Sequence, residues 1–138
     1  MATIDMQSMR YINLLDRFSK VKTSKCFVYN NTLFFAVDER QVSRAIGYSA
    51  ENIKKLQEKI GKKVRIIREP NSAGDLKRFV GDVVSPVRFK SLEIRDSEVL
   101  LTSGSNQNKA SLIGRNRRRY DELRKIVHDF FSLDLKII

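Results

Sequence analysis

The chain has 138 residues, a formal net charge of +11 and a hydrophobic content of 41%. This hydrophobic content is enough for a modest core and too high for a disordered chain. No apolar run approaches the roughly 20 residues that span a bilayer, and the first ten residues lack the pattern of a secretory signal. The single cysteine excludes an intrachain disulfide and favours a reducing, cytoplasmic setting.

The positive charge narrows the range of partners. It spreads along the chain, with a net +7 in residues 1–69 and +4 in residues 70–138. Such a charge favours a polyanion, either nucleic acid or an acidic membrane surface. A generally basic proteome would give the same balance without a polyanionic partner.

The spacing of apolar residues predicts helices and strands in two similar series. The first series comprises a helix over 5–20, strands over 26–29 and 33–37, a short helix between Asp38 and Gly47, a longer helix that ends at Gly61, and a strand over 64–67. Asp38 and Gln41 have the spacing of a capping box at the start of the short helix. After a linker at 70–73, the second series comprises a helix over 76–84, strands over 87–94 and 99–101, a short helix from Ser105 to Ile113, a longer helix over 120–130, and a strand over 135–138.

The two series are an internal repeat. A shift of 67 residues places Ile46 and Gly47 on Ile113 and Gly114, and the closing strands align after four further residues. Two strands followed by two helices and a third strand predict a three-stranded sheet covered by helices on one face. We therefore predict an α+β protein with two tandem domains, at 1–69 and 74–138.

Candidate binding residues surround the two glycine turns. Each turn precedes a helix start, where free backbone N–H groups and the helix dipole favour an anion such as phosphate. The candidates in the first repeat are Ile46, Gly47, Tyr48, Ser49, Ala50, Lys54 and Lys55, and those in the second are Ile113, Gly114, Arg115, Asn116, Arg117, Arg118 and Arg119.

Three of these groups carry specific expectations. The four arginines at 115 and 117–119 oppose the dipole of the helix they precede, so we interpret them as ligands of a bound anion rather than as a solvated helix end. Lys55 either contacts a bound anion or simply pairs with Glu51, four residues earlier. Tyr48 either stacks on a base or contacts a protein partner.

The run that starts at Ala45-Ile46-Gly47, continues through Asn52-Ile53-Lys54-Lys55 and ends at Gly61-Lys62-Lys63-Val64 resembles a KH domain, and the extra helix and strand before it resemble the type II order. KH domains clamp about four nucleotides of single-stranded nucleic acid at a Gly-x-x-Gly loop. Two such units in tandem resemble the archaeal NusA family. The resemblance implies a cytoplasmic, monomeric factor in transcription termination or antitermination that binds single-stranded RNA and possibly RNA polymerase, without a cofactor, a metal ion or a membrane.

Both turns depart from the KH pattern, because Ala50 and Arg117 replace the second glycine. This leaves open a second hypothesis, in which the chain is an interaction module that docks on RNA polymerase or another acidic partner with weak or no RNA affinity. Duplex DNA is a third and weaker candidate, since no helix-turn-helix or zinc motif is evident.

We do not expect an enzyme. His128 is the only histidine and has no cysteine or serine near it in the sequence. No nucleotide-binding glycine motif is present, and the carboxylates are scattered among basic residues.

Overall fold

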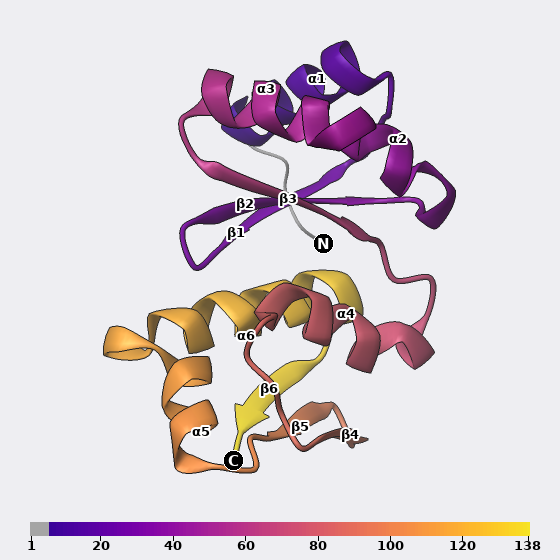
Figure 1. Ribbon diagram of the computed structural model, residues 1–138. Coiled ribbons are helices and arrows are strands. Elements are labelled where there is room, and N and C mark those ends of the chain that lie inside the picture. Colours follow the sequence, from indigo (N-terminus) through magenta and orange to yellow (C-terminus); the bar gives the residue numbers. More distant parts are fainter. Residues whose placement is uncertain (1–5) are drawn as a thin grey trace. The chain divides into compact units, whose positions relative to one another are not determined.

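A computed structural model describes residues 6–138 of the chain. The chain divides into two compact units, at residues 1–69 and 70–138, and Figure 1 labels their helices and strands. Each unit is described by itself below. Within residues 6–138, no helix is long and apolar enough to cross a membrane.

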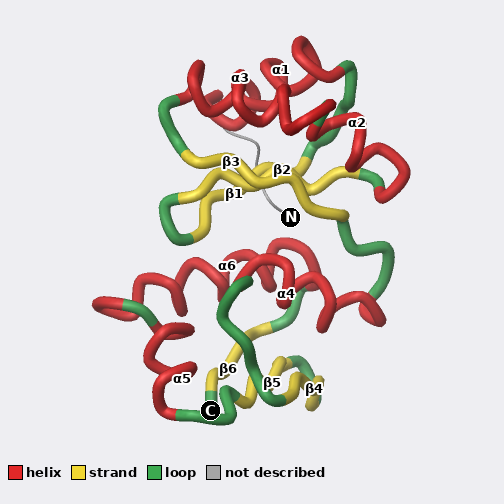
Figure 2. The backbone as a smooth tube through the Cα atoms, in the orientation of Figure 1, coloured by secondary structure: helices red, strands yellow, loops and turns green. Residues whose placement is uncertain are grey.

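The first unit is a three-stranded sheet with helices on one of its faces (Figure 2). Its elements are α1 (Met6–Ser19), β1 (Lys25–Tyr29), β2 (Thr32–Val37), α2 (Val42–Ile46), α3 (Glu51–Ile60) and β3 (Lys63–Arg68). The strand order is β1-β2-β3, with β1 antiparallel and β3 parallel to the central strand β2. This arrangement leaves β3 at one edge of the sheet.

The core of the first unit follows from the alternation of side chains along β2. Leu33, Phe35 and Val37 lie on the same face of the strand and belong to the buried cluster under the helices. Leu15 of α1 and Leu56 of α3 close this cluster, and both are completely buried. Both helices therefore pack against the same face of the sheet.

The second unit repeats this architecture. Its elements are α4 (Leu76–Val84), β4 (Ser91–Arg95), β5 (Glu98–Thr102), α5 (Asn106–Ile113), α6 (Arg118–Phe131) and β6 (Asp134–Ile137). The strand order is β4-β5-β6, again with one antiparallel and one parallel pair. The predicted fold class, two α+β units with a helix-covered three-stranded sheet in each, is confirmed.

The four extra residues of the second repeat lengthen its last helix. The α6 helix has 14 residues where α3 has 10, a difference of about one turn. The aromatic pair at its end packs on the helix that opens the unit, because the ring centroids of Phe130 and Phe131 lie 4.7 and 5.9 Å from that of Phe79.

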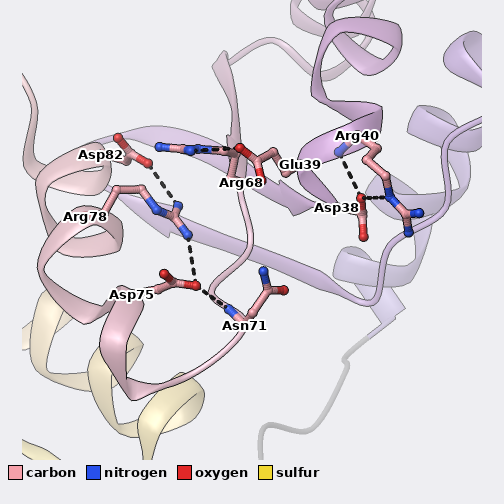
Figure 3. Close-up of polar contacts among 8 residues, drawn as sticks. All are labelled: Asp38, Glu39, Arg40, Arg68, Asn71, Asp75, Arg78 and Asp82. Atoms are coloured by element: carbon pink, nitrogen blue, oxygen red, sulfur yellow. Dashed lines mark hydrogen bonds and ion pairs between the residues drawn. The ribbon is translucent and has the colours of Figure 1, made fainter.

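One predicted strand boundary is wrong, and Asp38 is an N-cap as predicted, although of a 3-10 turn. The strand expected from residue 87 begins at Ser91, since the N–H of Val87 donates to the carbonyl of Val84 and prolongs the turn after α4. At the predicted capping box, the Asp38 carboxylate accepts from the N–H of Arg40 at 2.9 Å, and a 3-10 turn over Glu39–Gln41 precedes α2 (Figure 3).

Two other predictions concern the ends of the units. The first helix was expected to include Asp5, which lies outside the described residues. In the predicted linker, the N–H of Asn71 donates to Asp75 Oδ2 at 2.8 Å (Figure 3), and Ala73–Asp75 forms a 3-10 turn.

Candidate nucleic-acid interface

The two glycine turns have the same backbone conformation. We call residues 47–50, between α2 and α3, loop 1, and residues 114–117, between α5 and α6, loop 2. Loop 1 starts with Gly47 at φ 83° and ψ 168°, and loop 2 with Gly114 at φ 74° and ψ 173°. This combination of angles is essentially restricted to glycine, so both loops need their first glycine.

The last two positions of each loop are left-handed although none of them is glycine. Ser49 and Ala50 have φ of 51° and 59°, and Asn116 and Arg117 have φ of 57° and 60°. A left-handed conformation costs a non-glycine residue about 1–2 kcal/mol. The fourth position, where the KH pattern has a second glycine, therefore carries backbone strain in both loops.

A side chain bridges the two helices around each loop. Asn52 Nδ2 donates to the carbonyl of Arg44 at 3.1 Å, so it ties the start of α3 to the end of α2. In the second unit, Arg119 Nη1 donates to the carbonyl of Ser111 at 3.1 Å. These donors and acceptors correspond under the shift of 67 residues, and we call Asn52 and Arg119 the bridging residues.

The bridging residues pack directly on the loop glycines. A Cβ atom on Gly47 would lie 2.8 Å from Asn52 Nδ2, and one on Gly114 would lie 2.8 Å from Arg119 Cγ. Asn52 was absent from the residues predicted from sequence, although its position five residues after the glycine matches that of Arg119. Arg119 was predicted to bind RNA, and the structure gives it this packing contact and the hydrogen bond to Ser111.

The helices that follow the loops start without a side-chain cap. The N-cap residue of α3 is Ala50 and that of α6 is Arg117, and neither side chain accepts a hydrogen bond from the first turn. By contrast, the Ser105 hydroxyl caps α5 by accepting from the N–H of Asn108 at 3.1 Å. An uncapped start presents amide donors and the positive end of the helix dipole to the solvent or to a ligand.

Loop 2 is lined with arginines. Arg115, Arg117 and Arg118 are exposed and make no ion pair within residues 6–138. The guanidinium of Arg117 lies 4.8 Å from the ring centroid of Tyr120, whose hydroxyl donates to the carbonyl of Leu135 at 3.1 Å. The ring therefore holds Arg117 beside the start of α6. Asn116 is also exposed at this loop.

Loop 1 has a different character. Tyr48 is 89% exposed and Ser49 is exposed beside it. Lys54 is exposed on the first turn of α3, whereas Lys55 Nζ pairs with Glu51 at 3.0 Å. An exposed aromatic ring thus takes the place that the arginines occupy in loop 2.

Few other candidate binding or reactive groups occur in the described part of the chain. Ile46 and Ile113, which precede the glycines, are half-buried, and Ile46 packs against the core of its unit. Residues 6–138 contain no group of three or more histidine, cysteine or acidic side chains placed to hold a metal ion. His128 Nδ1 lies 3.9 Å from Asp129 Oδ1, and Cys26 is half-buried.

Comparisons with known proteins point to one group. No family model matches the chain. The chain is 29% identical over 84 residues to the probable transcription termination protein NusA of Methanocaldococcus jannaschii, which is 61% of this chain and 44% of that protein. It is 21% identical over 134 residues to the protein of the same name from Halococcus morrhuae, with 96% of this chain and 94% of that protein covered.

A second methanogen protein and a crystal structure extend the comparison. The NusA protein of Methanococcus vannielii is 23% identical over 92 residues, so the matched region spans about half the length of both methanogen relatives. The crystal structure of APE1850 is 27% identical, superposes with a TM-score of 0.71, and covers 98% of this chain and 100% of its own. The chain thus has weak homology to archaeal NusA-like proteins, and its fold is consistent with two KH-like units.

The loop geometry predicts that Gly47 and Gly61 differ in their tolerance of alanine. Both have positive φ, but Gly61 is left-handed with open space around it, whereas Gly47 lies in the glycine-only region against Asn52. We expect Gly47→Ala to lower the free energy of unfolding by about 3 kcal/mol and Gly61→Ala by about 1 kcal/mol. Urea denaturation measures both, and equal losses would contradict the packing described here.

The strain at the fourth loop position predicts an opposite effect for Ala50. Glycine at this position relieves the left-handed strain, which stabilises the folded state, but it also makes the unfolded chain more flexible, which opposes this gain. Because the strain is the larger effect, Ala50→Gly should raise the free energy of unfolding by about 0.5–1 kcal/mol. The matched control is Ala110→Gly on the exposed face of α5, which should lower it by about 1 kcal/mol. Urea denaturation that gave both variants the same sign would refute the strain.

Proposed function

We propose that the chain is a single-stranded RNA-binding protein of the archaeal NusA type, built from two type II KH domains that grip the RNA backbone at loops 1 and 2. The observation that carries this proposal is the shared geometry of the loops, each an exposed turn with a glycine-only start, followed by an uncapped helix. The element order, helix-strand-strand-helix-helix-strand in both units, supports the type II assignment.

Backbone capture follows from the donors at each helix start. A phosphate beside loop 2 would accept from the uncapped amides of α6 and from the guanidinium groups of Arg115, Arg117 and Arg118. The same arginines destabilise the empty helix start, because cations oppose the positive end of the dipole. A bound phosphate would turn this repulsion into attraction, which makes loop 2 the stronger backbone site.

Base recognition falls mainly to loop 1. Tyr48 offers an exposed ring on which a base can stack, a contact worth about 1–3 kcal/mol. The half-buried Ile46 and Ile113 offer apolar surface next to the glycines, where the backbone of RNA approaches most closely. In this proposal loop 1 would stack on bases, and loop 2 would neutralise phosphates.

The role in transcription is supported by the relatives. Proteins named as probable transcription termination factors match up to 96% of this chain, so we propose termination or antitermination as its process and RNA polymerase as a partner. We further propose that the chain acts in the cytoplasm, as a monomer without a cofactor, and catalyses no reaction.

A second candidate function is a module that docks on RNA polymerase or another acidic partner, with weak or no RNA affinity. The non-glycine residues Ala50 and Arg117 at the fourth loop positions favour this candidate.

Charge reversal at loop 2 tests the RNA-binding function. If about four phosphates are neutralised, log K against log salt should slope near −2.8 for single-stranded RNA, at roughly −0.7 per contact. Arg117→Glu with Arg118→Glu should weaken binding at least about tenfold and bring the slope near −1.4, as two of these contacts are lost. Fluorescence anisotropy with a labelled single-stranded oligonucleotide over a range of salt concentrations gives both quantities.

The matched control reverses Lys77 and Arg88, two exposed cations of the same unit that lie outside loop 2. Both double variants change the net charge equally, so a general loss of positive charge affects them alike. Equal weakening, or a salt slope near zero for the unsubstituted chain, would refute backbone capture at loop 2. Absence of any measurable RNA affinity would favour the protein-docking candidate.

A further inference from the structure

A shallow groove of the first unit lies between α1 and α3, and its lining contains no residue of loop 1. It has a volume of about 490 Å³, and its lining includes Met6, Met9, Arg10, Arg17 and Lys59. A second hollow of about 480 Å³ shares Arg10 and Lys59 and adds Lys55, Glu58 and Phe18. Because the two hollows share Arg10 and Lys59, we treat them as one surface, which we call the α1–α3 groove.

The groove exposes apolar surface. Met6 is 88% exposed and Met9 is 53% exposed, and Tyr48 and Met6 are the two most exposed large hydrophobic side chains in the described part of the chain. The two methionines are three residues apart and share one face of α1. Methionine is common on surfaces that bind helices, because its flexible thioether side chain adapts to different partners.

The rim of the groove is mostly basic, with Glu58 beside the second hollow and Lys55 paired with Glu51. Arg10, Arg17 and Lys59 are exposed and make no ion pair within the residues that the structure describes. Arg10 and Arg17 are seven residues apart on α1, about 10.5 Å along the helix axis. This spacing matches acidic side chains two turns apart on a second helix lying in the groove.

The second unit differs from the first at part of this surface. The residue equivalent to Lys59 is Ile126, which is buried. On the opening helix of that unit, Arg78 pairs with Asp75 at 3.6 Å and with Asp82 at 3.2 Å (Figure 3). An arginine of the second unit is therefore neutralised within its own unit, whereas Arg10, Arg17 and Lys59 of the α1–α3 groove make no ion pair within residues 6–138.

We propose that the α1–α3 groove docks an acidic amphipathic helix of a protein partner, with apolar side chains on the methionines and carboxylates on the basic rim. RNA fits the groove less well. Helix sides present no free amide donors, and the exposed apolar side chains of the groove are thioethers rather than aromatic rings. Lys59 of the groove lies near the end of α3, whereas loop 1 lies before the first residue of α3.

The test uses the full chain and a defined peptide. The probe is a fluorescein-labelled helical peptide of roughly 16 residues, about 24 Å long, with leucines at i, i+3, i+4 and i+7 and glutamates beside them. We expect Arg10→Glu with Arg17→Glu to weaken its binding about tenfold, since two attractive pairs become repulsive. Reversal of Lys22 and Lys63, exposed cations outside the groove, should change it less than about twofold.

The apolar contribution has its own variant. Met6→Gln with Met9→Gln keeps the charge, the side-chain length and the helix propensity, and should also weaken peptide binding about tenfold. The same variant should leave the affinity for a single-stranded RNA oligonucleotide unchanged, which separates this proposal from RNA binding at the loops. No binding of the peptide at low salt would overturn the proposal. Arginine reversal that weakened RNA binding and left peptide binding intact would assign the groove to RNA instead.

Discussion

A close contact between a glycine and the side chain five residues after it organises both junctions between helices. In each unit this side chain packs over the glycine and donates to a carbonyl of the preceding helix, at 3.1 Å in both cases. The contact ties the start of α3 or α6 to the helix that precedes its loop. Because the glycine must adopt a conformation closed to other residues, each turn depends on having glycine at its first position.

The repeat conserves the backbone of the loop and changes its chemistry. Loop 1 presents Tyr48 and loop 2 presents a group of arginines on the same left-handed turn. The two loops therefore offer an aromatic surface and a cationic surface on equivalent backbones. This combination suits a single-stranded nucleic acid, which has both bases and phosphates. The α1–α3 groove adds a further surface of the first unit, and its exposed methionines suit a protein rather than a nucleic acid.

The sequence predicts the fold better than it predicts the site. Apolar periodicity and the glycines at 47 and 114 locate the elements and the turns, because these signals are local. The left-handed conformation of Ala50 and Arg117 leaves no mark in the sequence, since neither residue favours it. The hydrogen bond of Asn52 and the pairing of α1 with α3 at the groove join segments that only the tertiary structure brings together.

The central claim is that the amides at loops 1 and 2 contact the RNA backbone, and amide chemical shifts test it most directly. Titration of the ¹⁵N-labelled chain with a single-stranded oligouridine should shift the amide resonances of residues 47–54 and 114–121. The hairpin turns at 30–31 and 96–97 serve as internal references and should shift little. Shifts confined to the hairpins or to α1, or no shifts at RNA concentrations that saturate binding, would contradict the account.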